Sequence, residues 1–375
     1  MLVLKLLKNM KIYYCFLIIV FLLFSCSKTK QGELPEIPVD MDQNSSLALS
    51  EIAEAITATE LEFTDKSLIN PGNIQRIIVS ANHVIIAELS KVLVFNKKGK
   101  FIRPIGSIGQ GPGEYKYIKT LAMDESSNRL FILSSSPSKI ICYDLNGNFL
   151  KESTLPFQFT DINYVNDQLI LVGEDWRGNE AKEFVSQAEL YRLNDNLQVI
   201  DNRTIRNIFV GPTPFGTLFR DTDFILNGNR SLYLYYGDFF YPALNGGNSA
   251  IRALCDTLYR FEDNQLVPEL KLKFKNNNTN KFIHLFNIYR SSRYIFSYYR
   301  NKQNENSYCF CYDTKTGKGY HMQDGFTDDI NLIEEPVRIR PFASDTEWFY
   351  YLHTHMKPDD IEEPNPTLYI GKLNN

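Results

Sequence analysis

Strand-like segments of this sequence recur in sets of four, and the sets close with similar turns. The first two sets end FNKKGKF at residues 95–101 and YDLNGNF at residues 143–149, an offset of 48 residues. Each places a turn containing glycine between two apolar runs, which is typical of a β-hairpin. A third set closes at Leu197, again 48 residues further on. A four-stranded unit repeated at a period near fifty predicts a β-propeller, because neighbouring blades cover the faces that a lone sheet would expose.

Six such sets fit between residues 46 and 375, so we predict an all-β fold, a six-bladed β-propeller of four-stranded antiparallel blades. Each blade would take about 55 residues, more than the ~40–45 of compact blades, so some loops must be long. A β-sandwich or two smaller β domains would need no recurring closing turns. One helix is expected, over Leu47–Ala58, where apolar residues fall at helical spacing. We expect Thr59–Phe63 to pair with Thr367–Ile370 and close the ring, because a propeller must hide its last edges.

Residues 1–25 have the features of an export signal. Lysines precede an apolar run at residues 12–24, which is shorter than the ~20 residues of a membrane-spanning helix. The run ends Leu-Phe-Ser-Cys, which resembles a bacterial lipobox, so we predict a lipoprotein signal peptide and lipidation at Cys26. An ordinary secretory signal with an incidental cysteine is the alternative. Translation could begin at Met1 or at Met10, since the shorter form is also a complete signal.

Residues 26–45 are polar and contain two prolines, so a flexible tether is predicted before a propeller at residues 46–375. Residues 27–30 lack the acidic cluster that some surface lipoproteins of the Bacteroides group carry, which favours the periplasmic face over the cell surface. The formal net charge is −4, and lysine and arginine are scattered, so no nucleic-acid footprint is present. The expected partners are the membrane, through the lipid anchor, and a glycan, peptide or envelope protein.

The segment GSIGQGPGEY at residues 106–115 is the most distinctive in the chain. With residues 95–103 it resembles the signature of the six-bladed β-propeller lipoproteins of Bacteroidetes, which are related to NHL-repeat propellers. Segments Leu49–Ile52, Asp256–Tyr259 and Asn365–Leu368 resemble other parts of that family. The resemblance implies a propeller in the cell envelope. It implies no activity, because the family has no settled one.

The glycines of this segment could be taken for a phosphate-binding loop, but the Lys-Ser/Thr ending is absent and more strand follows. We interpret them as turn residues and expect at least one at positive φ. Glu114 and Tyr115 then fall near the start of the next blade. They are binding candidates at the channel rim, unless they only tie the loop down.

Two further pairs are binding candidates. Arg338 and Arg340 alternate with apolar residues on a predicted strand, so both could hold an anionic ligand, or both could be ordinary surface residues. His353 and His355 share one face and could bind a metal with a third ligand from the acidic residues that follow. The alternative, which we favour, is a polar strand end beside a solvated acidic loop.

No nucleophile elbow and no H-E-x-x-H motif is present, and no catalytic residue, metal or cofactor is predicted. Whether the protein is an enzyme is left open, with a non-catalytic role favoured. We predict a ligand- or partner-binding module, since the 22 tyrosines and 26 phenylalanines suit contacts with sugars and proteins. The alternative is a metal-dependent hydrolase or lyase with its site at the propeller channel.

Overall fold

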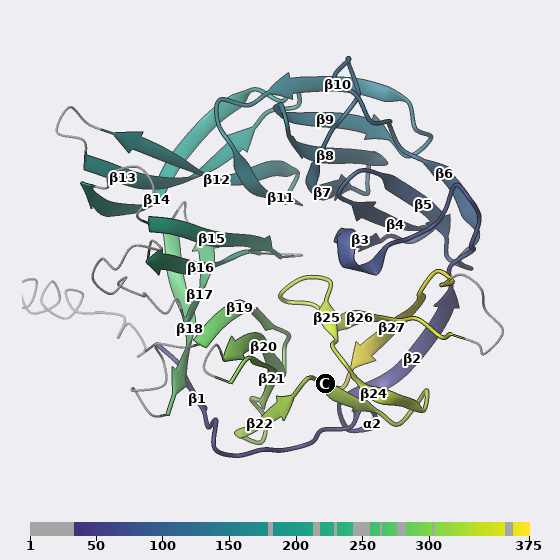
Figure 1. The fold of residues 1–375 in the computed structure, drawn as a ribbon, viewed down its shortest axis with the longest axis vertical. Helices are drawn as coiled ribbons and strands as arrows, with labels where there is room; N and C mark the ends of the chain where they lie inside the picture. Colours follow the sequence, from purple (N-terminus) through teal and green to yellow (C-terminus); the bar gives the residue numbers. More distant parts are fainter. Residues whose placement is uncertain are drawn as a thin grey trace, which may run out of the picture. The chain divides into compact units, whose positions relative to one another are not determined.

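Six four-stranded antiparallel sheets stand around a common centre as the blades of a β-propeller, which confirms the predicted fold (Figure 1). The propeller lies within the compact unit Glu36–Asn375. The computed structural model describes residues 34–178, 183–212, 218–228, 231–242, 256–262, 265–275, 283–301, 304–356 and 363–375.

Each blade is a meander whose first strand lies nearest the centre. Blade 1 consists of β3 (Ile74–Val79), β4 (His83–Glu88), β5 (Val92–Asn96) and β6 (Phe101–Pro104). Blade 2 consists of β7 (Ile118–Asp124), β8 (Arg129–Ser135), β9 (Ser138–Asp144) and β10 (Phe149–Thr154). Blade 3 consists of β11 (Phe159–Val165), β12 (Gln168–Gly178), β13 (Glu183–Leu193) and β14 (Val199–Pro212). Blade 4 consists of β15 (Leu218–Asn227), β16 (Leu232–Pro242), β17 (Thr257–Glu262) and β18 (Gln265–Phe274). Blade 5 consists of β19 (Ile283–Arg290), β20 (Tyr294–Asn301), β21 (Asn306–Asp313) and β22 (Lys318–Gln323). Blade 6 consists of β25 (Arg340–Pro341), β26 (Trp348–His353), β27 (Thr367–Leu373) and β2 (Ala53–Glu60).

The apolar core lies between neighbouring blades. Residues 84–88 of β4 and 92–95 of β5 are buried without alternation, because another blade covers each face of the sheet. One cluster joins blades 1 and 2 and includes Ile85, Leu121 and Ile132. Cys309 and Cys311 are buried free thiols inside another cluster. Burial of this kind fixes the blades against each other and leaves polar groups for the centre and the two ends.

The N-terminal part of the chain completes the last blade. Strand β2 pairs with β27, with Glu60 opposite Thr367 and Thr59 opposite Leu368, so ring closure onto Thr367–Ile370 is confirmed (Figure 1). The predicted bounds of the closing strand are wrong, because it spans Ala53–Glu60 and not Thr59–Phe63. The predicted helix is wrong beyond its first residues, because α2 spans only Leu49–Ile52 and Ala53–Glu60 is strand. Threonines and an isoleucine favour strand here, and β27 offers a complete row of backbone partners that a helix would leave exposed.

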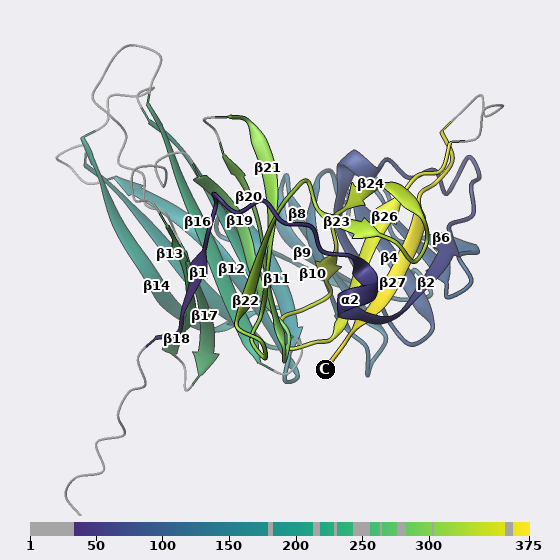
Figure 2. The same ribbon diagram turned by 90° about the horizontal axis from the view of Figure 1, so that it is seen from below.

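The last part of the segment predicted as a tether, residues 26–45, is not free of the propeller. Strand β1 (Glu36–Val39) adds to β18 in parallel and buries Ile37 and Val39. Pro38 is tolerated because β1 lies at the edge of the sheet. The following segment crosses blade 5, where the Ser45 amide donates to the His321 carbonyl at 2.8 Å, and reaches α2 (Figure 2).

A two-stranded sheet of β23 (Phe326–Asp328) and β24 (Ile333–Val337) connects blades 5 and 6. A short 3₁₀ turn, η1 (Pro71–Asn73), precedes β3. Within the described residues, no helix has the length and apolar character needed to cross a membrane. The predicted signal peptide and Cys26 lie outside the described residues.

Candidate binding site in the propeller channel

A cavity of about 440 Å³ occupies the centre of the ring and is lined from every blade. The innermost strands each contribute to it, through Arg76, Lys119, Thr160, Ile225, Asn287 and Arg340. Arg76, Lys119 and Thr160 stand near the beginnings of their strands. The cavity therefore lies toward the end of the channel where the inner strands begin.

β-Bulges direct extra side chains into this cavity. Strands β3, β7, β11 and β19 each shift register near the start, and the residues skipped by the pairing are Gln75, Lys119, Thr160 and Phe286. All four line the cavity. A bulge places two consecutive residues where regular pleating would place one, and bulges are common beside functional sites because they redirect side chains.

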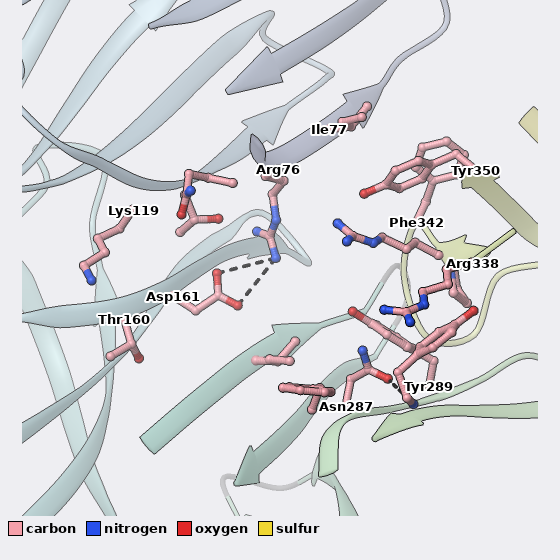
Figure 3. Close-up of a pocket in the computed structure, with 17 residues that line it drawn as sticks. Arg76, Ile77, Lys119, Thr160, Asp161, Asn287, Tyr289, Arg338, Phe342 and Tyr350 are labelled. Atoms are coloured by element: carbon pink, nitrogen blue, oxygen red, sulfur yellow. Dashed lines mark hydrogen bonds and ion pairs between the residues drawn. The ribbon is translucent and has the colours of Figure 1, made fainter. Parts of the chain in front are cut away.

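Arg76 ties four blades together at the base of the cavity. Its guanidinium donates to the carbonyls of Leu121 and Ile162, both at 2.8 Å, and to Leu226 at 3.3 Å. It also lies 3.4 Å from the Asp161 carboxylate (Figure 3). That carboxylate accepts from the Leu226 amide at 2.8 Å. Burial raises the pKa of Asp161, and the Arg76 charge and the backbone amides of Ile162 and Leu226 oppose the rise. Arg76 and Asp161 therefore form an ion pair with each other inside the protein.

Arg340 has different surroundings. Among the described residues it makes no ion pair with a carboxylate, and its polar neighbours are the hydroxyls of Tyr350, Tyr289 and Tyr298. Partial loss of water inside the channel opposes its charge, but these tyrosines hold the pKa of Arg340 above its ordinary value. Burial raises the pKa of Tyr289 to about 12, so this hydroxyl stays neutral and can donate. Figure 3 shows Tyr289 and Tyr350 on the side of the cavity that faces Arg76.

The cavity carries more positive than negative charge. Among the described residues, Arg76, Lys119, Arg338 and Arg340 line it with a single carboxylate, that of Asp161. Arg338 is partly engaged, since its Nε donates to the Asp324 carbonyl at 3.0 Å. Lys119 projects on the opposite side of the cavity from Arg338 (Figure 3). Of the four cations, sequence reasoning identified Arg338 and Arg340 and missed Arg76 and Lys119.

Comparison with known proteins gives a family for this chain. A family model described as "Domain of unknown function (DUF4934)" matches residues 34–371. The chain belongs to this family. No curated protein matches it.

Solved structures show similarity to the DUF4934 chain at the level of the fold. A candidate exported protein from Bacteroides fragilis is 16% identical, with a TM-score of 0.61 over 91% of this chain and 100% of that one. A member of the DUF4221 family from Bacteroides vulgatus is 9% identical, with a TM-score of 0.43 over 86% of this chain and 97% of that one. The propeller part of the predicted resemblance is confirmed by the six blades of the structure itself.

The glycine-rich segment forms a self-contained turn between blades 1 and 2 of this DUF4934 protein. The Glu114 carboxylate accepts from the Gly111 amide at 2.8 Å, and the Gly109 amide donates to the Tyr115 carbonyl at 3.0 Å. Tyr115 is only 1% exposed, and its hydroxyl donates to the Ile105 carbonyl at 2.7 Å. Glu114 and Tyr115 therefore tie the loop down, the second of the two roles considered for them, and do not line the channel cavity.

His353 and His355 lie together at the end of β26, with ring centroids 4.5 Å apart. His355 Nε2 is 2.6 Å from the Tyr369 hydroxyl. Burial and the neighbouring His355 lower the pKa of His353, which keeps its imidazole neutral. No group of three or more histidine, cysteine or acidic side chains suited to a metal occurs among the described residues. Four acidic residues were considered as further ligands: Asp359, Asp360 and Glu362 lie outside the described residues, and Glu363 lies within them and is exposed.

Proposed function

We propose that this protein is a non-catalytic binding module of the bacterial cell envelope whose channel receives an anionic group of its ligand. The observation that carries the proposal is Arg340, a guanidinium set among tyrosine hydroxyls with no carboxylate partner among the described residues. A carboxylate, phosphate or sulfate would supply the missing charge and accept from these donors. Lys119 and Arg338 add positive charge to the same cavity.

A cationic wall favours this role over the hydrolase or lyase considered from the sequence. A divalent metal would be repelled by Arg340, Arg338 and Lys119, and Asp161 is already paired with Arg76. An acidic sugar or the C-terminal carboxylate of a peptide fits both the charge and the volume of about 440 Å³.

Matched ligands test the proposal. Binding is measured by calorimetry for a peptide with a free C-terminus and its amidated twin, and for galacturonic acid and galactose oligomers. We expect the acidic member of at least one pair to bind more tightly than its neutral twin. Arg340→Met should weaken the binding of that acidic ligand tenfold or more, because a hydrogen bond to a charged group contributes about 1.5–3 kcal/mol. Arg103→Met, on the outer strand β6, is the control. Acidic ligands that bind Arg340→Met and the native protein equally would refute the assignment.

We also propose that Cys26 carries the lipid and that the propeller faces the periplasm. The short apolar run ending in Leu-Phe-Ser-Cys supports the anchor, and the fold shared with a candidate exported protein of Bacteroides fragilis agrees with export. Cys26→Ser should release the protein from the membrane fraction or leave it unprocessed. Cys15→Ser, in the segment that processing removes, should change neither. A Cys26→Ser protein of native size that still sediments with membranes would contradict the anchor.

A further inference from the structure

A second cavity, of about 600 Å³, lies at the other end of the inner strands. It is formed by residues that follow the inner strands of blades 4, 5 and 6: Ser231 after β15, Ser291 and Ser292 after β19, and Asp345, Thr346 and Glu347 after β25. Trp348, the first residue of β26, also lines it, and we call it the Trp348 cavity. It shares no lining residue with the channel cavity.

The charges of the Trp348 cavity are balanced, unlike those of the channel. Three cations, Arg260, Arg290 and Lys372, line it with three carboxylates, Glu269, Asp345 and Glu347. Glu269 accepts from Arg260 at 3.0 Å and pairs with Arg290. Lys372 pairs with Glu54 at 2.8 Å. An ion would have to break such pairs to bind, whereas a neutral hydroxylated molecule can add hydrogen bonds to them.

Trp348 supplies an apolar surface at a fixed position. Its side chain is 49% exposed although it lies in a strand. Its amide donates to Thr346 Oγ1 at 3.3 Å, and its carbonyl accepts from the Phe342 amide at 3.1 Å. These bonds fix the backbone of Trp348, and a tryptophan side chain has only two rotatable bonds, so it loses little conformational freedom on binding. The indole also combines a large apolar face with a polar edge. The carbon–hydrogen face of a sugar ring is the complementary surface.

Glu347 leaves an acceptor unused at the same place. Its Oε1 accepts from the Ser292 amide at 3.0 Å. Its Oε2 is buried and has no hydrogen-bond partner among the described residues. A buried acceptor without a donor is costly, so a ligand hydroxyl that reaches it after a small rotation of the carboxylate would be favoured.

We propose that the Trp348 cavity binds a neutral saccharide, with the sugar ring against the Trp348 indole and its hydroxyls on Glu347 and the paired charges beside it. This site is separate from the channel and does not depend on the function proposed for it. Together the two sites would give the propeller one face for an acidic group and one for a neutral sugar.

Tryptophan fluorescence tests the proposal, because the chain has two tryptophans, Trp176 and Trp348. In a Trp176→Phe protein, Trp348 is the single reporter. It is titrated with neutral oligomers of glucose, mannose, xylose, galactose and N-acetylglucosamine. We expect saturable quenching or a spectral shift with at least one of them. Absence of a response to every oligomer would overturn the proposal.

Variants then separate a binding role from a structural one, with affinity measured by calorimetry. Trp348→Ala should weaken binding at least tenfold, and Trp348→Phe should keep part of it, because a smaller aromatic face remains. Glu347→Gln should weaken binding less than Trp348→Ala. Arg340→Met in the channel should leave sugar binding unchanged, so the two sites fail independently. Undiminished binding to folded Trp348→Ala would refute the site.

Discussion

The glycine-rich turn and the channel wall use their polar groups in opposite ways. In the turn, the Gly109, Gly111 and Gly113 amides all donate to acceptors within the protein, and the last one reaches Glu152 at 2.9 Å. In the channel, Arg340 faces only tyrosine hydroxyls and Lys119 makes no ion pair within the described residues. The turn therefore contributes shape, and the channel retains unused binding capacity. Measurements of stability and of anion affinity on variants of both regions test that division.

The largest effect is expected within the channel itself, at Arg76. Arg76→Met should lower the free energy of unfolding by about 3–5 kcal/mol, because it leaves the buried Asp161 carboxylate without its partner. Urea denaturation measures the loss. Arg338→Met, which removes an exposed pair with Asp324, should cost less than 1 kcal/mol. Equal stability of the two variants would show that the contacts of Arg76 with the other blades do not stabilise the propeller.

The next largest effect is expected in the turn, at Gly113. Its φ is +77°, and an added Cβ would stand 3.0 Å from the Phe149 ring. Gly113→Ala should cost roughly 1–3 kcal/mol, since residues with a side chain are strained in this region. Gly72→Ala is the matched control, because Gly72 is exposed and is not in the left-handed region. Both variants should bind acidic ligands with the affinity of the native protein. A Gly113→Ala protein of native stability with impaired binding would contradict the view that the turn contributes only shape.

A smaller effect with a pH signature is expected at Glu152. Burial favours its protonated form, but Lys139 and the Gly113 amide hold the pKa of Glu152 below its ordinary value. Its contribution is therefore complete above pH ~4.3 and is lost as the pH falls from there through the folded-state pKa. Glu152→Gln should cost about 0.5–1.5 kcal/mol at pH 7. Melting curves from pH 7 to pH 3 should show a gentler acid slope for the variant, and an unchanged slope would contradict the assignment.

The smallest effect on stability is expected at Lys119. Lys119→Met should change the unfolding free energy by less than about 0.5 kcal/mol, because the side chain is exposed and unpaired within the described structure. It should still weaken the binding of an acidic ligand, and more at low salt than at high salt. A salt-independent affinity would place the ligand away from this side of the channel.

The parts of the molecule that sequence predicted are those determined by neighbouring residues. Closing turns such as FNKKGKF predicted the blades. The alternation of Arg338 and Arg340 with Val337 and Ile339 predicted that both arginines lie on one side, and both line the cavity, although the predicted single strand is interrupted between β24 and β25. Lys119 was missed because a bulge interrupts the two-residue period in β7. The pairing of Arg76 with Asp161 was missed because it joins blades 1 and 3, and nothing in either local segment specifies the other.

The N-terminal strand has a consequence for how the chain reaches its native state. Glu60 is synthesised long before its partner Thr367, so blade 6 cannot be completed until the other five blades have been synthesised. Contacts between such distant residues slow folding, because a long loop must close before they form. Until then β2 lacks the strand that it pairs with, and an unpaired strand edge is prone to aggregation. The yield of folded protein should therefore depend on how quickly β2 and β27 meet.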